Sequence, residues 1–388
     1  MKLLVEAMEE LRGDGLRCAR GIADWYANNQ VRQRDYIHGA GTFPSSISFI
    51  GQPMRAVTNW NLAFATMAQI AAGTAFGEDL YTHSARKMVS YLRALQIFDP
   101  FVPNHYGGIR EMTAHTPWCY VRDALSGAWG FLEYYRVTGE EEYLERARLW
   151  AQWYFKNGCD DDGLPLWGVV FGEPISDGTP VMCNDMLGDF TGGNLNFFYQ
   201  MYRATGDKQY IDERFRHFAD FFLTRVQQPD GWFKTVRKSD GSVPESDPQG
   251  GLHRTNDDFA SLGLLCAYRV TGEKRYIEGV KRFLDAVFAT QREDGSFEPT
   301  CAGVPVVLNT MLEAEGLLGP WSKQRLEAAR RALMFLSTRQ NKGDILPNQR
   351  GALDEYGDGA VCTRSSAYAL ICLLKLFAGE ARFLSAAE

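Results

Sequence analysis

Aspartates stand at one recurring position of this chain. Each lies 14 to 17 residues before a glycine of a repeated motif: Asp123 before Gly139, Asp189 before Gly206, and Asp257 with Asp258 before Gly272. The position is the first turn of a predicted helix, where Asp is a preferred cap and is favoured by the helix dipole. Carboxylates that face a shared cavity can also work as general acid and base. Capping and catalysis both remain open for these residues.

The glycines belong to a segment that occurs three times with a period of 66 to 67 residues. The copies read YYRVTGEEEYLERARLWAQW, MYRATGDKQYIDERFRHFADFF and AYRVTGEKRYIEGVKRFLDAVF. An apolar stretch, typical of a helix buried on most sides, comes before each Thr-Gly pair. Glycine then ends the helix in a left-handed conformation, and an amphipathic helix follows. Each unit is therefore predicted to be an inner helix followed by an outer one.

Weaker copies extend the array to six helical hairpins. Residues 60–95 and 306–340 repeat the pattern, and residues 365–379 form a sixth apolar inner helix. The amphipathic stretch 5–29 supplies the missing outer helix. An array with buried inner helices must cap or close to hide its ends. We therefore expect an all-α (α/α)6 barrel that occupies residues 1–388 as a single domain, with 5–29 beside 365–379.

Long connections lead back to the inner helices, and they are the expected place for function. Residues 96–124, 171–193 and 237–260 exceed an ordinary turn. Ordering such loops costs entropy that a bare turn avoids, so loops of this length are usually functional. We expect them to gather polar and aromatic side chains at one mouth of the barrel. The candidate substrate-binding residues in these loops and at neighbouring positions are Trp60, Asn61, His115, Trp118, Arg122, Trp232, His253, Arg254, Asp257 and Asp258.

These residue types suit a carbohydrate. Sugars present apolar faces that stack on aromatic rings and hydroxyls that bind planar polar groups. Arg122 and Arg254 each lie close to a candidate aspartate. A guanidinium there either binds a sugar carboxylate through two hydrogen bonds or neutralises the neighbouring acid. The sequence leaves both roles open.

An apolar helix opened by Asp and closed by Y-R-x-T-G-D/E-x-x-Y resembles the six-hairpin glycosidase superfamily, especially its unsaturated glucuronyl and rhamnogalacturonyl hydrolases. The resemblance implies a glycan-active hydrolase or hydratase that acts on oligosaccharides containing uronic acids, including unsaturated ones. It also implies that aspartates at successive inner-helix starts face the sugar as acid and base. By position these are Asp123 and Asp189, with Asp185 in CNDMLGDF as an alternative for the second. The His-Asp-Leu-Gly segment of that family is absent here, and NWNLAF at 59–64 stands near its place.

Other functions fit the same barrel. A sugar isomerase similar to N-acylglucosamine 2-epimerase would use His115 and His253 as acid and base. A polysaccharide lyase would use Tyr or His to take the proton next to a uronate carboxylate. A terpenoid-cyclase-like or noncatalytic binding barrel is a further alternative, since QREDGSFEP at 291–299 is similar to the repeats of such cyclases. Fold alone does not choose among these functions.

Composition excludes several partners. The net charge of −7, with no cluster of Lys and Arg, argues against nucleic acid as the partner. The eight cysteines lack CxxC or Cys/His spacing, so neither a zinc site nor a disulfide framework is expected. The acids at 160–162 lack the alternation of a calcium loop. We expect no metal and no cofactor.

The chain also lacks the signals of a membrane or secreted protein. MKLLVEAMEELRGDG carries acids where a signal peptide needs an apolar core, and no apolar run is long enough to span a bilayer. These features predict a soluble, cytoplasmic protein that binds an oligosaccharide and exists as a monomer or homodimer.

Overall fold

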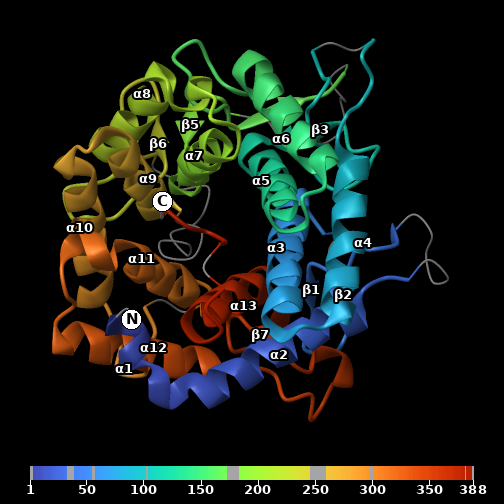
Figure 1. Ribbon diagram of the computed structural model, residues 1–388, viewed down its shortest axis with the longest axis vertical. Coiled ribbons are helices and arrows are strands. Elements are labelled where there is room, and N and C mark those ends of the chain that lie inside the picture. Colours follow the sequence, from blue (N-terminus) through green and yellow to red (C-terminus); the bar gives the residue numbers. More distant parts are fainter. Residues whose placement is uncertain are drawn as a thin grey trace.

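The computed structural model describes residues 3–32, 39–54, 57–101, 104–172, 183–244, 259–297, 300–380 and 382–386. The helices form two concentric layers around a common axis (Figure 1). The predicted (α/α)6 barrel is therefore confirmed. None of the helices in the described ranges is long and apolar enough to cross a membrane.

The inner layer is a closed ring. Its helices are α3 (Asn59–Phe76), α5 (Val121–Thr138), α7 (Gly193–Thr205), α9 (Ala260–Thr271), α11 (Gly303–Leu318) and α13 (Thr363–Phe377). Each inner helix contacts the next, and α13 returns to α3. Because every inner helix has neighbours on both sides, almost its whole circumference is buried. In α3 the buried stretch runs without interruption from Asn59 to Gly73.

The outer helices pack against this ring. They are α2 (Arg12–Asn29), α4 (Asp79–Leu95), α6 (Glu141–Trp153), α8 (Glu213–Phe221), α10 (Lys274–Ala289) and α12 (Lys323–Thr338). Each buries one face, as α10 does with Tyr276, Val280, Phe283 and Val287. Helix α2 contacts α13. The predicted closure between the N-terminal outer helix and the last inner helix is therefore confirmed.

The repeated Thr-Gly pair ends three inner helices in the same way. Gly139 has a φ of +73°, and its N–H donates to Tyr135 O at 2.7 Å. A residue with a Cβ is strained at this φ, which explains the glycine. The Thr138 hydroxyl donates to Tyr134 O at 2.9 Å and accepts from Glu140 N at 3.2 Å. The pair therefore turns the chain sharply from inner to outer helix.

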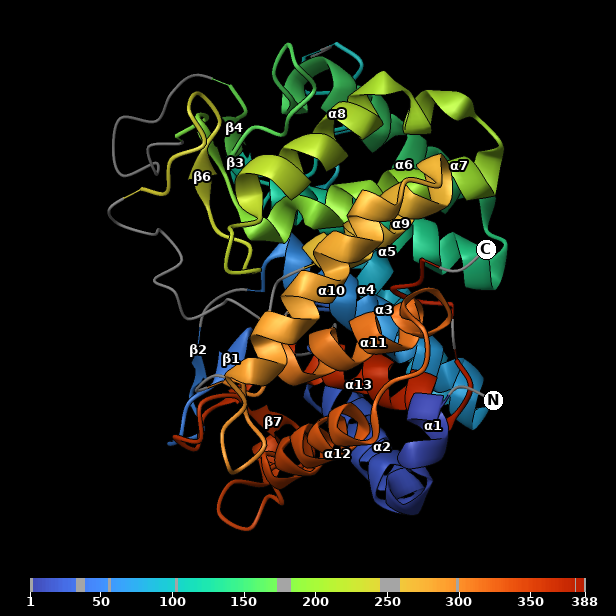
Figure 2. The same cartoon turned by 90° about the vertical axis from the view of Figure 1, so that its left-hand side faces the viewer.

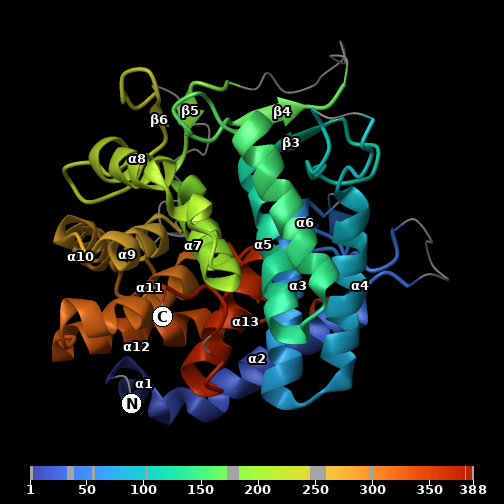
Figure 3. The same ribbon diagram turned by 45° about the horizontal axis from the view of Figure 1, so that its top comes forward.

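Short strands lie at the opposite end of the inner helices, where the sequence indicated only loops. They are β1 (Ser46–Ile47), β2 (Pro53–Met54), β3 (Trp118–Tyr120), β4 (Gly168–Val170), β5 (Met186–Leu187), β6 (Val236–Arg237), β7 (Leu353–Asp354) and β8 (Val361–Cys362). Strands β2, β1, β8 and β7 form one sheet, which ties early and late parts of the chain together. The strands gather at one end of the barrel, and both termini lie at the other (Figures 2 and 3). We call the strand-bearing end the mouth.

Smaller elements complete the chain. They are α1 (Leu3–Ala7), η1 (Glu9–Leu11), η4 (Asp189–Gly192), η5 (Lys208–Ile211), η7 (Pro347–Gln349) and the π turns η3 (Tyr154–Gly158) and η6 (Phe222–Val226). The π turns end α6 and α8 at equivalent points, and an Asp-Gly turn follows each of them. Gly163 and Gly231 in these turns have φ values of +81° and +92°. Both glycines thus have the positive φ that such turns favour.

Candidate active site

Three neighbouring inner helices place their second residue at one point of the mouth. These residues are Trp60 of α3, Arg122 of α5 and Arg364 of α13. The guanidinium carbon of Arg122 lies 4.2 Å from the centroid of the Trp60 ring, and that of Arg364 lies 5.7 Å from it. Because α13, α3 and α5 are adjacent in the ring, equal positions along the three helices bring these side chains together. We call Trp60, Arg122 and Arg364 the arginine–tryptophan cluster.

Arg122 is fixed by two buried acids. Its Nε donates to Asp123 Oδ1 at 2.5 Å, and the side chain of Asp123 is only 4% exposed. Asp123 also hydrogen-bonds to Glu111, whose residue is 1% exposed. Glu111 Oε2 accepts from Tyr120 N at 3.0 Å, which ties the segment before β3 to the start of α5. An acid pair therefore lies directly behind Arg122.

The Glu111 carboxyl has a raised pKa. Burial, the charge of Asp123 and the hydrogen bond with Asp123 raise the pKa of Glu111 well above its ordinary value, and Tyr120 N–H and Arg122 offset this only in part. Two ionised carboxylates in hydrogen-bonding contact would repel each other, which favours the protonated form of Glu111. A carboxyl group with a raised pKa is suited to general acid–base catalysis.

The raised pKa of Glu111 predicts a pH dependence of stability. A carboxyl whose pKa is higher in the folded state adds stability that is complete below its unfolded pKa and is lost as pH rises through the folded pKa. Glu111→Gln keeps a donor toward Asp123 and does not titrate. We therefore expect the difference in melting temperature, Glu111→Gln minus wild type, to increase as pH rises above 4.5, the ordinary pKa of Glu.

A matched control has the opposite sign. Arg146 lowers the pKa of the exposed Glu142 carboxyl through a hydrogen bond. A lowered pKa adds stability that is lost as pH falls, so Glu142→Gln should differ most from the wild type at high pH, where it is the less stable protein. Melting curves of the three proteins between pH 4 and pH 9 measure both slopes. A pH-independent difference for Glu111→Gln would show that Glu111 does not hold the proton.

A second acid supports the other arginine. Nη2 of Arg364 donates to Glu355 Oε1 in a short contact, and the side chain of Glu355 is 1% exposed. Glu355 lies between β7 and β8, and its main-chain oxygen accepts from Cys301 N at 3.0 Å. Its second carboxyl oxygen has no hydrogen-bond partner within the described ranges. The Glu355 charge adds to burial in raising the pKa of Cys362 to about 12, which keeps this thiol protonated.

Aromatic rings close the space below the cluster. The Phe190 ring lies 4.3 Å from the Arg122 guanidinium carbon. A cavity of about 10 Å³ lies among the starts of the inner helices and is lined by Trp60, Arg122, Leu125, Ser126, Trp129, Phe190, Gly193 and Phe259. This volume holds about one water molecule. A ligand larger than a water molecule does not fit in this cavity.

Two further predicted site residues lie near this end of the barrel. Asn61 is buried in the first turn of α3, and its Nδ2 donates to Ser45 Oγ at 3.3 Å. Asn61 Oδ1 has no hydrogen-bond partner in the described part of the chain. Trp118, half-buried on β3, packs edge-on to Tyr120 with ring centroids 5.1 Å apart. The structure thus places Trp60 and Arg122 within the cluster and Asp123 in contact with it. Asn61 and Trp118 lie at the same end of the barrel.

Other predicted residues lie elsewhere. Asp185 accepts from Ser239 N at 3.0 Å and from Ser239 Oγ at 2.9 Å, and so ties the residue before β5 to the turn after β6. Trp232 is buried against Phe283 of the outer helix α10, with ring centroids 6.0 Å apart. His115 is exposed and lines a separate cavity of about 1030 Å³ beside α4. These three residues are not part of the proposed site.

Several predicted residues fall outside the described ranges. These are His253, Arg254, Asp257 and Asp258, together with the side chain of Asp189. The backbone of Asp189 begins η4, which leads directly into α7. Asp189 is thus at the start of the inner helix next to α5, as the repeat spacing predicted.

Sequence reasoning missed Glu111, Glu355 and Arg364. Arg364 had a usable signal, because it is the second residue of an inner helix, as Arg122 is. Glu111 and Glu355 carry no such signal, since they lie in irregular segments outside the repeat. Only the tertiary structure brings them to the arginines.

A metal site finds no support among the described residues, where no group of three or more His, Cys, Asp or Glu side chains could hold an ion. At the predicted acid cluster, Asp160 Oδ2 instead accepts from Lys238 Nζ at 2.5 Å. Its Oδ1 accepts from Leu164 N at 2.9 Å, which closes the Asp-Gly turn. These contacts are those of a structural turn.

Known proteins share this fold. No model of a protein family and no curated protein matches the sequence. A sugar epimerase from a ruminal bacterium matches with a TM-score of 0.72 at 14% identity, covering 95% of this chain and 98% of its own. The unsaturated glucuronyl hydrolase of Bacillus sp. GL1 matches with a TM-score of 0.67 at 15% identity, covering 94% of this chain and 96% of its own.

An α-1,6-mannanase of Salegentibacter sp. HEL1_6, bound to α-1,6-mannotriose, matches with a TM-score of 0.65 at 12% identity. It covers 95% of this chain and 99% of its own, and its structure is that of an inactive variant with two adjacent aspartates replaced by asparagine. All three proteins have the six-hairpin fold. The resemblance to the six-hairpin glycosidase superfamily is therefore confirmed for the architecture of this chain.

Proposed function

From this six-hairpin fold and the acids that support the arginine–tryptophan cluster, we propose that the protein is a glycoside hydrolase acting on oligosaccharides that contain uronic acids. The observation that carries the proposal is the buried Glu111–Asp123 pair at the start of α5 next to Arg122, in which the pKa of Glu111 is raised. The fold neighbours act on carbohydrates, which agrees with this reading.

The proton of the acid pair has a defined role in this proposal. Glu111 passes its proton to the Asp123 carboxylate, and Asp123 gives this proton to the leaving oxygen as the glycosidic bond to the anomeric carbon breaks. Asp189, at the start of the neighbouring inner helix, is the second carboxylate and activates water or attacks the sugar. The separation of the two carboxyl groups decides between these roles, since a retaining pair lies about 5 Å apart and an inverting pair about 6.5–9.5 Å apart.

The arginines set the preference for a charged sugar. Arg122 and Arg364 stand beside the same indole ring, and each is paired with one buried carboxylate. With Glu111 protonated, the two guanidinium charges balance those of Asp123 and Glu355. The mouth therefore does not repel a substrate carboxylate, although the whole chain carries −7. A planar guanidinium also matches a carboxylate better than a neutral hydroxymethyl group.

The substrate is tested with a uronate oligosaccharide, saturated and unsaturated, and its carboxyl-reduced form. We expect kcat/KM to be at least about tenfold higher for the uronate form, the scale of one charged hydrogen-bond contact. Arg122→Lys should lower kcat/KM on the uronate by a larger factor than on the reduced form. Arg237→Lys, at an exposed arginine 3.8 Å from Asp185, is the matched control and should behave as wild type. Equal activity on both substrates would overturn the uronate preference.

A sugar epimerase is the second candidate, because the fold is shared with a sugar epimerase. An epimerase would invert a carbon of the sugar without consuming water, and it would use His115 and His253 as acid and base. Incubation in H2¹⁸O separates the two functions, since a hydrolase puts ¹⁸O into a new reducing end and an epimerase releases no second sugar. Mass spectrometry of the products shows which of the two reactions occurs.

A further inference from the structure

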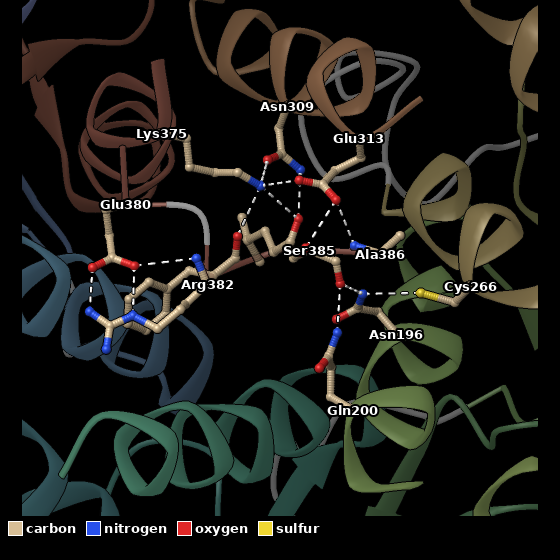
Figure 4. A network of polar contacts seen from close by, with 12 residues as sticks. Asn196, Gln200, Cys266, Asn309, Glu313, Lys375, Glu380, Arg382, Ser385 and Ala386 are labelled. Carbon is tan, nitrogen blue, oxygen red and sulfur yellow. Dashed lines mark hydrogen bonds and ion pairs between the residues drawn. The ribbon is translucent and has the colours of Figure 1, made fainter. Parts of the chain in front are cut away.

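A short irregular segment of the chain runs through the inside of the helical ring. Residues 382–386, which we call the inner segment, lie near the ring axis (Figure 1). Phe383, Leu384 and Ala386 are at most 4% exposed. The contacts of the inner segment come from side chains of α5, α7, α11 and α13, mostly in the halves of these helices away from the mouth (Figure 4). The inner segment therefore occupies space that the inner helices enclose.

Side-chain amides of the ring bind the main chain of the inner segment. Ser385 O accepts from Asn196 Nδ2 at 2.9 Å and from Gln200 Nε2 at 2.6 Å. Leu384 O accepts from Asn309 Nδ2 at 3.1 Å. Carbonyl oxygens are present in every residue of a peptide, so these contacts recognise a peptide chain and its direction more than its side chains.

An ion pair completes the recognition. Lys375 Nζ contacts Glu313 Oε1 at 2.7 Å and also donates to the carbonyls of Phe383 and Leu384 at 3.1 and 3.2 Å. Glu313 Oε2 accepts from Ser385 Oγ at 3.0 Å and from Ala386 N at 2.8 Å. The ammonium thus meets carbonyl groups, and the carboxylate meets N–H and O–H groups. Each charged group therefore lies next to inner-segment atoms of opposite polarity.

The surroundings hold the backbone of the inner segment in a constrained conformation. Leu384 has a φ of +48°, a conformation that bulky residues rarely adopt. Such a conformation persists only where the surroundings hold it in place. Without the inner segment, Asn196, Gln200 and Asn309 would lose the carbonyls that satisfy their buried amide groups. The interior of the ring is therefore built around this peptide.

The inner segment also reaches the candidate site. Leu384 lines a cavity of about 10 Å³ together with Phe259 and Tyr368. Trp60 Nε1 donates to the Tyr368 hydroxyl at 3.0 Å. Leu384 and Tyr368 therefore border the same small cavity, and the Tyr368 hydroxyl accepts from the indole on which Arg122 lies.

We propose that the interior of the ring is a peptide-binding site that reads the main chain, that the inner segment occupies it as a built-in ligand, and that this occupancy positions Trp60 through Tyr368. The peptide-binding part of this inference does not depend on the proposed function. The positioning part rests on it, because an enzymatic readout needs a substrate.

Cleavage of the folded protein tests the binding site. Ala378 and Gly379 are exposed, so a protease recognition sequence is inserted between them and cut after folding. The cut segment should remain bound through gel filtration, with a melting temperature close to that of the uncut protein. It should then exchange with a fluorescent synthetic peptide of residues 380–386. The exchange rate reports the binding directly.

Matched variants separate recognition from general stability. Gln200→Leu removes one amide donor and should speed exchange about tenfold, the scale of a lost hydrogen bond to a buried carbonyl. Gln209→Leu, on the exposed turn η5, should leave the exchange rate unchanged. Immediate loss of the cut segment without a change in melting temperature, or equal exchange rates in both variants, would overturn the peptide site.

The positioning role has its own readout. Tyr368→Phe keeps the ring and should leave peptide exchange unchanged, but it removes the hydroxyl that accepts from Trp60. We expect KM for the uronate substrate to rise by about tenfold with a smaller change in kcat. Unchanged KM would end the positioning role. If no sugar is a substrate for the intact protein while exchange behaves as expected, the proposed function fails and the peptide site stands.

Discussion

Replacing Asp123 with asparagine is expected to lower turnover by about two orders of magnitude or more, the usual scale of lost general acid–base catalysis. Asparagine still accepts from Arg122 Nε and from Glu111 through its amide oxygen, so the barrel should remain folded. It cannot take or give the proton that Glu111 holds. Asp189→Asn, at the start of the next inner helix, is expected to have an effect of the same order. Steady-state kinetics on the preferred substrate measures both losses.

Asp185→Asn is the matched control for these variants. Asp185 binds Ser239 in the turn after β6, so its replacement should leave turnover within a few fold of wild type. Circular dichroism and thermal melting check the fold of each variant. If Asp123→Asn instead lowers the melting temperature while the folded fraction keeps normal turnover, Asp123 only anchors Arg122, and the catalytic acids lie elsewhere.

Replacing Lys375 with methionine is expected to cost about 3–5 kcal/mol of unfolding free energy, because it leaves a buried carboxylate without its counter-charge. The side chains of Lys375 and Glu313 are each 3% exposed, and their charged atoms lie 2.7 Å apart. The same change also removes donors from two carbonyls of the inner segment. Denaturation with urea, analysed at constant m-value, measures the loss.

An exposed ion pair provides the control. Lys281 pairs with Asp285 at 2.7 Å, with side chains 64% and 46% exposed. Lys281→Met should change stability by about 0–1 kcal/mol, as is usual for surface pairs. The double variant Lys375→Met with Glu313→Gln should recover part of the loss, since no unpaired charge is then buried. A cost for Lys375→Met no larger than that for Lys281→Met would show that the interior is open to water.

The sequence by itself determined the barrel. The period of 66 to 67 residues, the apolar helix before each Thr-Gly pair and the amphipathic helix after it predicted six hairpins and their closure. These features are local and repeated, so each copy reports the same hairpin. The repeat also indicated that inner-helix starts share one end of the barrel, which placed Asp123 and Arg122 correctly at the mouth.

Tertiary structure decided which side chains meet there. Glu111 and Glu355 reach the arginines from irregular segments whose course follows from side-chain packing and from the small sheet of β1, β2, β7 and β8. The same holds for residues 382–386, which carry no repeat signal and yet lie among four inner helices. Periodicity in a sequence reports which face of a helix is buried. The partner that covers a buried polar group, however, comes from a distant part of the chain, and only the closed ring brings the two together.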